Sequence, residues 1–258
     1  MASPLLQEVF AGKLLGIDVA FNDLSALQKG EIAVIAAGFT GLLSLFNIGG
    51  RFLWASVSDY IGRKMTYFVF FALGFALYAS IPSMANGGHL ALFVGFFCII
   101  LSMYGGAFAT IPAYLADLFG TQMVGAIHGR LLTAWATAGV LGPVLVNYIR
   151  EFQIANGVPK AQAYDVTMYV LAGMLVLGFL CNLMVRPLAD KYFMNEQELA
   201  AEKKLAHDRD SAGTTGGVGT GSSQPTSTVT TAFAWAAVGI PLAIGIWITL
   251  QKAVVLFR

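Results

Sequence analysis

The chain has 258 residues, of which 57% are hydrophobic and only 11% are charged, and its mean hydropathy is +0.71. Soluble domains carry about 25% charged residues, so this composition excludes an ordinary soluble domain and predicts a protein embedded in a lipid bilayer. A formal net charge of +1 argues against binding of nucleic acid through a basic surface.

The first segment, residues 1–24, contains Gln7, Glu8, Lys13 and Asp18. These polar residues interrupt the apolar pattern before it reaches the roughly 20 residues that a membrane-spanning helix needs. We therefore predict that residues 1–24 form a partial helix, too short to span a bilayer.

Uncharged apolar runs of spanning length then recur along the chain. They predict six membrane helices, at 32–50, 65–88, 90–116, 131–149, 166–185 and 232–251. Lysine and arginine gather more on the side of loop 51–64 and tail 186–210, which predicts a cytoplasmic location for that side. We expect residues 25–187 to form a five-helix transmembrane bundle.

Between the fifth and sixth predicted spans lies a polar insert, residues 188–231. Its first part, 195–210, begins with Asn195 and has acidic residues early and lysines late, the order that the dipole of a helix favours. The rest, 211–231, is rich in Gly, Ser and Thr and predicts a flexible linker. The insert thus predicts a cytoplasmic helix and tether, followed at 232–258 by an additional transmembrane helix.

Signals of catalysis or metal binding are missing from the sequence. Cys98 and Cys181 both lie inside apolar runs, which argues against a disulfide framework, and the three histidines have no metal-ligand spacing. There is no nucleophile elbow, P-loop or dinucleotide fingerprint. We expect neither an enzyme nor a bound metal or cofactor.

The turn "SDYIGRK" is the most specific local pattern. Asp59 and Arg63 form an i,i+4 pair, Gly62 permits a tight turn, and Lys64 follows. An ordinary cytoplasmic loop that obeys the positive-inside rule would also contain such cations. The whole string, however, resembles the D-x-x-G-R-R/K signature of the major facilitator superfamily. This resemblance implies that these four residues form a cytoplasmic gating latch.

Other stretches resemble one family within that superfamily. "SPLLQEVF" (3–10), "PAYLADLFG" (112–120), "HGRLLTAW" (128–135) and "GVLGP" (139–143) are similar to the seventh, tenth and eleventh helices of the oxalate/formate antiporters. The likeness runs from about residue 3 to 187. It implies a C-terminal half of a twelve-helix carrier, with residues 1–24 as the outer part of its seventh helix and a six-helix N-terminal half missing from this chain. The last apolar segment resembles a single-helix small subunit found with some transporters.

Arg51 is the cation within an apolar segment that most needs an explanation. If its helix continues to Asp59, it lies about 12 Å from that boundary, close to the middle of the bilayer. An intramembrane charge is costly and is a functional candidate by default, although it could instead snorkel to the surface or pair with a missing partner. "NIGGR" resembles the family's eighth helix, whose arginine is thought to hold a substrate carboxylate.

The resemblance also bears on the substrate. Oxalate-type members have a lysine in the eleventh helix, and its counterpart here is Trp135. One cation instead of two favours a monocarboxylate over a dicarboxylate. Tyr104 and Tyr114 lie within predicted helices, where they are candidates for substrate contact, although packing is the commoner role of such residues.

The sequence therefore predicts an all-α membrane protein: the C-terminal half of a major-facilitator-type helix bundle plus one extra transmembrane helix. We expect a multi-pass protein of the cell inner (plasma) membrane that contacts lipid and binds no nucleic acid. Its expected function is secondary active transport of small organic anions such as formate, lactate or pyruvate by alternating access. The alternative is a truncated membrane subunit, or gene fragment, that does not transport.

Overall fold

The computed structural model describes residues 2–17, 21–160, 162–189, 195–213 and 228–254. In these ranges the chain forms helices and no strand. Six of the described helices are long and apolar enough to cross a membrane. The prediction of an all-α membrane helix bundle with six spans is confirmed.

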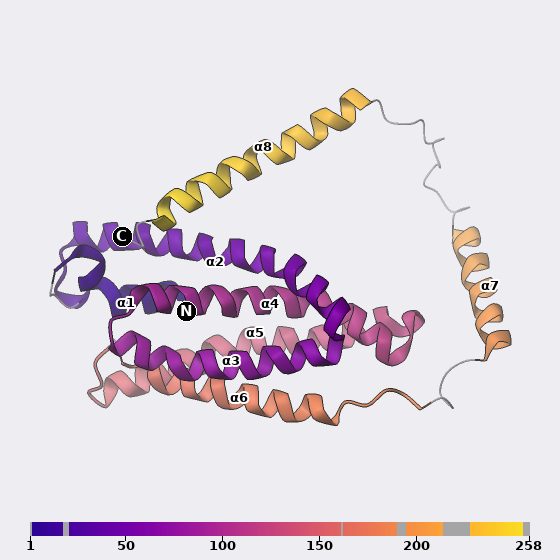
Figure 1. Ribbon diagram of the computed structural model, residues 1–258, viewed down its shortest axis with the longest axis horizontal. Helices are drawn as coiled ribbons and strands as arrows, with labels where there is room; N and C mark the ends of the chain where they lie inside the picture. The colour runs from indigo at the N-terminus through magenta and orange to yellow at the C-terminus, as the bar shows by residue number, and fades with distance from the viewer. Residues whose placement is uncertain (1, 18–20, 161, 190–194, 214–227, 255–258) are drawn as a thin grey trace. The chain divides into compact units, whose positions relative to one another are not determined.

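The main unit comprises residues 1–186 and 246–258. Figure 1 shows its longest helices, α2 to α6, lying side by side. The helix bounds in this unit are α1 Ala2–Leu15, α2 Ala26–Ile61, α3 Arg63–Asn86, α4 Leu90–Phe119, α5 Val124–Ala155 and α6 Asp165–Met184. With 14 residues, α1 is only about 21 Å long, shorter than a bilayer core.

The second helix, α2, is much longer than the predicted span 32–50. It begins after Ser25, whose hydroxyl accepts a hydrogen bond from the backbone N–H of Gln28 in a capping box, and it continues for 36 residues. The expected loop 51–64 is therefore wrong, because apolar residues continue past Arg51 and nothing breaks the helix before Gly62. Gly62 has a φ of 85°, a conformation that disfavours side chains, and it alone separates α2 from α3.

Glycines bring α2 and α4 into backbone contact. A Cβ atom on Gly50 would collide with the backbone of Ser102, and one on Gly105 would collide with the backbone of Asn47. Two turns of α2 are therefore locked against two turns of α4 by contacts that only glycine allows. This close contact fixes the part of α2 that carries Arg51.

Helices α1 and α5 differ strongly in how much of their surface is buried in the bundle. The short helix α1 is anchored in the apolar core through Leu5, Leu6 and Phe10, and the rings of Phe10 and Phe93 lie 4.9 Å apart. In contrast, none of the residues of α5, all of which are described, is buried. Much of the apolar surface of α5 is thus available to lipid or to another protein.

The second unit comprises residues 187–245. It contains α7, Glu196–Gly213, and the first part of α8, Thr228–Ala253. The backbone N–H of Glu198 donates to the Asn195 side chain at 2.8 Å, which confirms the predicted cap. The expected linker 211–231 is wrong at both ends, because 211–213 belong to α7 and 228–231 to α8, and its residues 214–227 lie outside the described residues. The last turns of α8 belong to the main unit, where Thr249 lies against Gly41 of α2.

Candidate functional site

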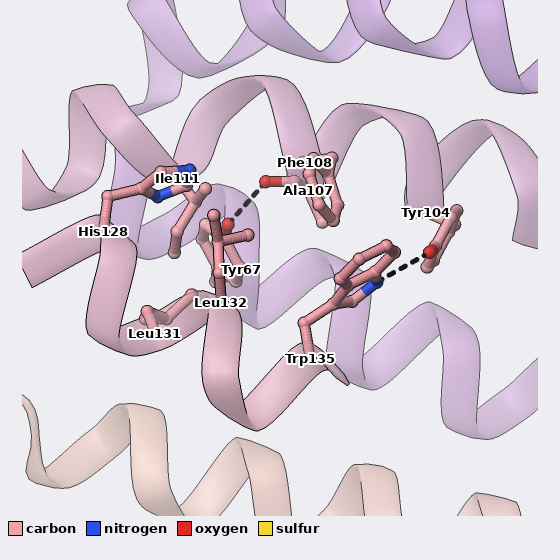
Figure 2. Close-up of a pocket in the computed structure, with 9 residues that line it drawn as sticks. All are labelled: Tyr67, Tyr104, Ala107, Phe108, Ile111, His128, Leu131, Leu132 and Trp135. Atoms are coloured by element: carbon pink, nitrogen blue, oxygen red, sulfur yellow. Dashed lines mark hydrogen bonds between the residues drawn. The ribbon is translucent and has the colours of Figure 1, made fainter. Parts of the chain in front are cut away.

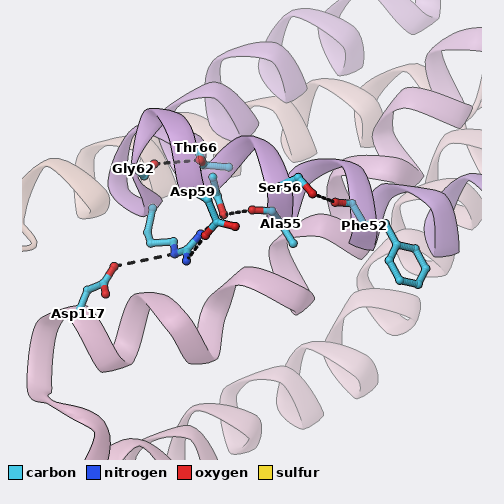
Figure 3. A network of polar contacts seen from close by, with 9 residues as sticks. Phe52, Ala55, Ser56, Asp59, Gly62, Thr66 and Asp117 are labelled. Atoms are coloured by element: carbon cyan, nitrogen blue, oxygen red, sulfur yellow. Dashed lines mark hydrogen bonds and ion pairs between the residues drawn. The ribbon is translucent and has the colours of Figure 1, made fainter.

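A network of charges lies where α2, α3 and α4 end or begin (Figure 3). Arg63 at the start of α3 forms an ion pair with Asp59 of α2 at 2.5 Å and a longer one with Asp117 of α4 at 3.9 Å. Arg63 also donates a hydrogen bond to the hydroxyl of Ser58 on α2. One guanidinium therefore joins the ends of three helices, which is the geometry expected of a latch.

Lys64 extends these connections to α6. Its ammonium group donates to the carbonyl of Val185 at 2.6 Å, and its own carbonyl accepts from the amide of Asn182 at 3.3 Å. The hydroxyl of Tyr114 on α4 in turn donates to the side-chain oxygen of Asn182 at 3.1 Å. Arg63 and Lys64 thus contact the ends of α2, α4 and α6.

We expect Asp59→Asn to shift the balance of conformations rather than substrate affinity. The Asp59 side chain is 62% exposed, and exposed ion pairs contribute about 0–1 kcal/mol, so the effect on exchange rate should be below about tenfold. The measurement is carboxylate exchange by an assembled carrier in liposomes. Asp117→Asn is the matched control, since its longer ion pair predicts a smaller effect. A selective loss of affinity in Asp59→Asn would place the pair in a binding site instead.

A second feature is an aromatic pocket of about 190 Å³ between α4 and α5, with Tyr67 of α3 at its back (Figure 2). Its wall is almost wholly apolar. The residues that line it are Tyr67, Tyr104, Ala107, Phe108, Ile111, His128, Leu131, Leu132 and Trp135. No lysine or arginine is among these lining residues.

Two predicted site residues meet at this pocket. The indole N–H of Trp135 donates to the hydroxyl oxygen of Tyr104 at 3.1 Å, as Figure 2 shows. Because Tyr104 accepts this bond, its own O–H remains a donor, and it has no other partner among the described residues. The pair thus presents one oriented hydroxyl donor at the rim of an apolar pocket.

His128 is the other polar residue at the pocket. Its Nδ1 atom is buried and lacks a hydrogen-bond partner among the described residues. Buried polar atoms without partners are uncommon in folded proteins. Because this nitrogen is inaccessible to solvent, a ligand could reach it only if the pocket wall moved.

The remaining predicted site residues lie elsewhere. Arg51 is exposed on α2, is absent from the pocket lining, and makes no side-chain hydrogen bond or ion pair with any described residue. Because α2 is continuous to Ile61, the estimate of about 12 Å between Arg51 and Asp59 along the helix holds. Tyr114 is buried behind the pocket, where its ring stacks on Tyr67 at 5.3 Å.

Sequence reasoning missed the partners of the predicted residues. Asp117 and Asn182 complete the networks of Arg63 and Lys64, yet no local pattern singled them out. Asp117 lies in the stretch "LADLFG", and its place at the end of α4 was the available signal. In the described part of the chain, no group of three or more His, Cys, Asp or Glu could hold a metal ion.

Comparison with known proteins finds two transporters that are similar to part of this chain. It is 36% identical over 122 residues to the oxalate:formate antiporter of Oxalobacter formigenes, which covers 46% of this chain and 29% of that protein. It is 26% identical over 151 residues to monocarboxylate transporter 14 of Mus musculus, covering 57% of this chain and 27% of that protein. No protein-family model and no solved structure matches.

The matched part of this chain covers less than a third of the length of either relative. The relationship nevertheless agrees with the membrane bundle and with the charged turn between α2 and α3. It confirms the resemblance inferred from the sequence motifs. Over the matched part of its length, the chain is a multi-pass membrane protein related to transporters of the major facilitator type.

Proposed function

We propose that the chain is the C-terminal half of a secondary active transporter for small monocarboxylates such as formate, lactate or pyruvate. It would act in the cell inner (plasma) membrane by alternating access, rocking against an N-terminal six-helix half. The proposal assigns substrate binding to Arg51, with Tyr104 and Trp135 at the aromatic pocket and Tyr114 supporting the pocket from behind. It assigns gating to Asp59, Gly62, Arg63 and Lys64.

The observation that carries the proposal is that Arg51 is exposed on α2 and has no side-chain partner among the described residues. An unpaired guanidinium within a membrane-spanning helix is costly. A guanidinium fork matches a carboxylate in shape and charge. A substrate carboxylate would therefore supply the partner that the bundle does not.

The pocket supports a monocarboxylate rather than a dicarboxylate. A second carboxylate would need a second cation, and Trp135 provides an indole where oxalate-type carriers have a lysine. Trp135 and Tyr104 together offer one hydroxyl donor, while the rest of the wall is suited to an apolar group. One negative charge suits a single cation such as Arg51, and the apolar wall disfavours a second charge.

The test is exchange of labelled carboxylates across liposomes. The chain is reconstituted with a six-helix partner, sought in the reading frame upstream of the Met1 codon, and loaded with unlabelled formate, lactate or pyruvate. We expect saturable counterflow of monocarboxylates, with oxalate a poor competitor. No exchange of any carboxylate would support the alternative, a membrane subunit that does not transport.

Residues 1–258 by themselves are expected not to transport. One bundle supplies only one wall of the cavity in carriers that bind substrate between two halves. The measurement is uptake of labelled formate, lactate and pyruvate into liposomes that contain only the purified chain. Robust, saturable uptake would contradict the prediction and would favour a carrier assembled from two copies of this bundle.

A further inference from the structure

A second charge cluster, separate from the sites above, joins α1 to α5. Arg150 of α5 contacts Glu8 of α1 with two nitrogens: its Nε lies 3.3 Å from one carboxylate oxygen and a terminal nitrogen lies 2.5 Å from the other. The side chains are only 18% and 11% exposed. The other terminal nitrogen of Arg150 forms an ion pair with Glu151 at 2.6 Å, but the Glu151 side chain is 69% exposed. The interaction that connects α1 to α5 is therefore the partly buried, bidentate ion pair of Glu8 and Arg150.

The aromatic ring of Tyr164, just before α6, completes this cluster. The guanidinium carbon of Arg150 lies 5.6 Å from the centre of the ring. Burial, together with the negative charge of Glu8, raises the pKa of Tyr164 to about 12. The phenol thus stays neutral at physiological pH, and the charges of the cluster are those of Glu8, Arg150 and Glu151.

The cluster lies at the end of α5 far from the Arg63 network. Arg150 is 26 residues beyond Val124, the start of α5, which corresponds to about 39 Å of helix. α1 is fixed in the core by Leu5, Leu6 and Phe10, whereas α5 has no buried residue. Glu8 is therefore an anchored group, and Arg150 is the means by which the far end of α5 attaches to it.

The helix backbone is weakened between this attachment and the aromatic pocket. Pro143 cannot donate a hydrogen bond to the carbonyl of Gly139, which removes one rung of the helix. Nothing outside the helix's own nearby backbone lies within 4 Å of where a Cβ on Gly139 or Gly142 would be, so α5 is not tightly packed at these two positions. Residues 139–143 thus have the features of a hinge.

A large cavity, mainly apolar but with Glu8 and Arg150 in its wall, lies behind the segment that follows this hinge. Its volume is about 590 Å³, and Arg150 and Glu8 line it with Pro4, Gly142, Pro143, Val146, Asn147, Tyr164 and Leu171. The cavity is thus bounded by α1, by the head of α6 and by α5 on both sides of Pro143. The cavity is partly open, and movement of residues 144–155 away from α1 would widen its opening.

We propose that residues 144–155 of α5 form a hinged arm that opens and closes this cavity, and that the Glu8–Arg150 ion pair is the latch that holds the arm closed. Releasing the pair frees the arm to bend at residues 139–143. The Glu8–Arg150 latch controls the end of the bundle opposite the Arg63 network. The device concerns the bundle itself, so it can be tested without transport or knowledge of the substrate.

The test measures how fast a cysteine in the cavity reacts with a maleimide. The full chain is placed in nanodiscs, where both ends are open to the reagent, and carries Leu171→Cys with Cys181→Ser, since Cys181 is exposed and Cys98 is buried. Glu8→Gln is expected to raise the labelling rate by about tenfold or more, a change in opening of about 1.4 kcal/mol. Glu151→Gln is the matched control and should stay within about twofold, because its exposed pair does not reach α1.

Two further variants separate a latch from general loosening. Exchanging the partners, with Glu8→Arg and Arg150→Glu together, should return the labelling rate towards that of the wild type. A second reporter, Ile111→Cys in the aromatic pocket, should label at the same rate with and without Glu8→Gln.

Three results would overturn the proposal. They are a folded Glu8→Gln variant with the wild-type rate at position 171, an equal increase at position 111, and no recovery in the exchanged pair. If Glu8→Gln does not fold, Arg150→Lys replaces it, because lysine keeps the charge but loses the two-pronged contact. That variant should label at least about threefold faster at position 171, and a wild-type rate would overturn the proposal.

Discussion

Arg51→Gln is expected to weaken monocarboxylate binding by about 10- to 100-fold in an assembled carrier. Hydrogen bonds to charged groups contribute about 1.5–3 kcal/mol, and the side chain of Arg51 has no other partner among the described residues to compensate for the loss. Arg51→Lys keeps the charge but not the fork, so its affinity should fall between those of the wild type and the glutamine variant. The measurement is competition binding with formate, lactate and pyruvate.

The matched control is Arg130→Gln, which removes the same charge from the exposed surface near the start of α5. It should leave affinity nearly unchanged. Equal affinities in wild type, Arg51→Lys and Arg51→Gln would contradict the anion-binding role of Arg51. A clear preference of the wild type for oxalate would instead contradict the argument from Trp135, which predicts one carboxylate and not two.

Gly50→Ala is expected to destabilise the bundle strongly. The added methyl group would meet the backbone of Ser102, which cannot turn aside as a side chain could, so α2 and α4 must separate. Overpacking costs typically about 1–3 kcal/mol, and a backbone collision belongs at or above the top of that range. The measurement is the thermal unfolding temperature of the purified chain in detergent.

Gly49→Ala is the control next to it, because nothing lies within 4 Å of the position of its Cβ. Alanine is favoured over glycine in a helix interior by roughly 0.5–1 kcal/mol, so Gly49→Ala should be neutral or slightly stabilising. Adjacent glycines with opposite responses would show that contact with α4, and not helix propensity, decides the outcome. Equal responses would mean that α2 and α4 are not packed as described.

The number of spans and the charged turn could be predicted from the sequence because both are local signals. The length of an apolar run can be compared with the thickness of a bilayer. The motif "SDYIGRK" is recognisable from its seven residues alone. The end of α2 could not be predicted from hydropathy, since a helix does not stop where its apolar run stops. Arg51 and Asp59 interrupt the hydropathy of α2 but not its hydrogen bonding, and only Gly62 ends it.

The contacts between helices were not predictable in the same way. Glu8 and Arg150 are 142 residues apart, and each is an unremarkable charge in its own segment. Asn182 likewise becomes informative only when α6 brings it to Lys64 and Tyr114. Such pairs follow from how helices pack, which depends on glycines such as Gly50 and Gly105 that have no signal of their own in a hydropathy profile.

The single-residue connection between α2 and α3 has a consequence for biogenesis. Gly62 alone forms a connection too short to let one helix enter the bilayer while the other stays in water. We therefore expect the two to insert together as a helical hairpin. Arg63 and Lys64 directly follow the turn, and cations of this kind are retained on the cytoplasmic side during insertion. Under the positive-inside rule, the same cations that join the helix ends would also favour insertion of this hairpin with its turn on the cytoplasmic side.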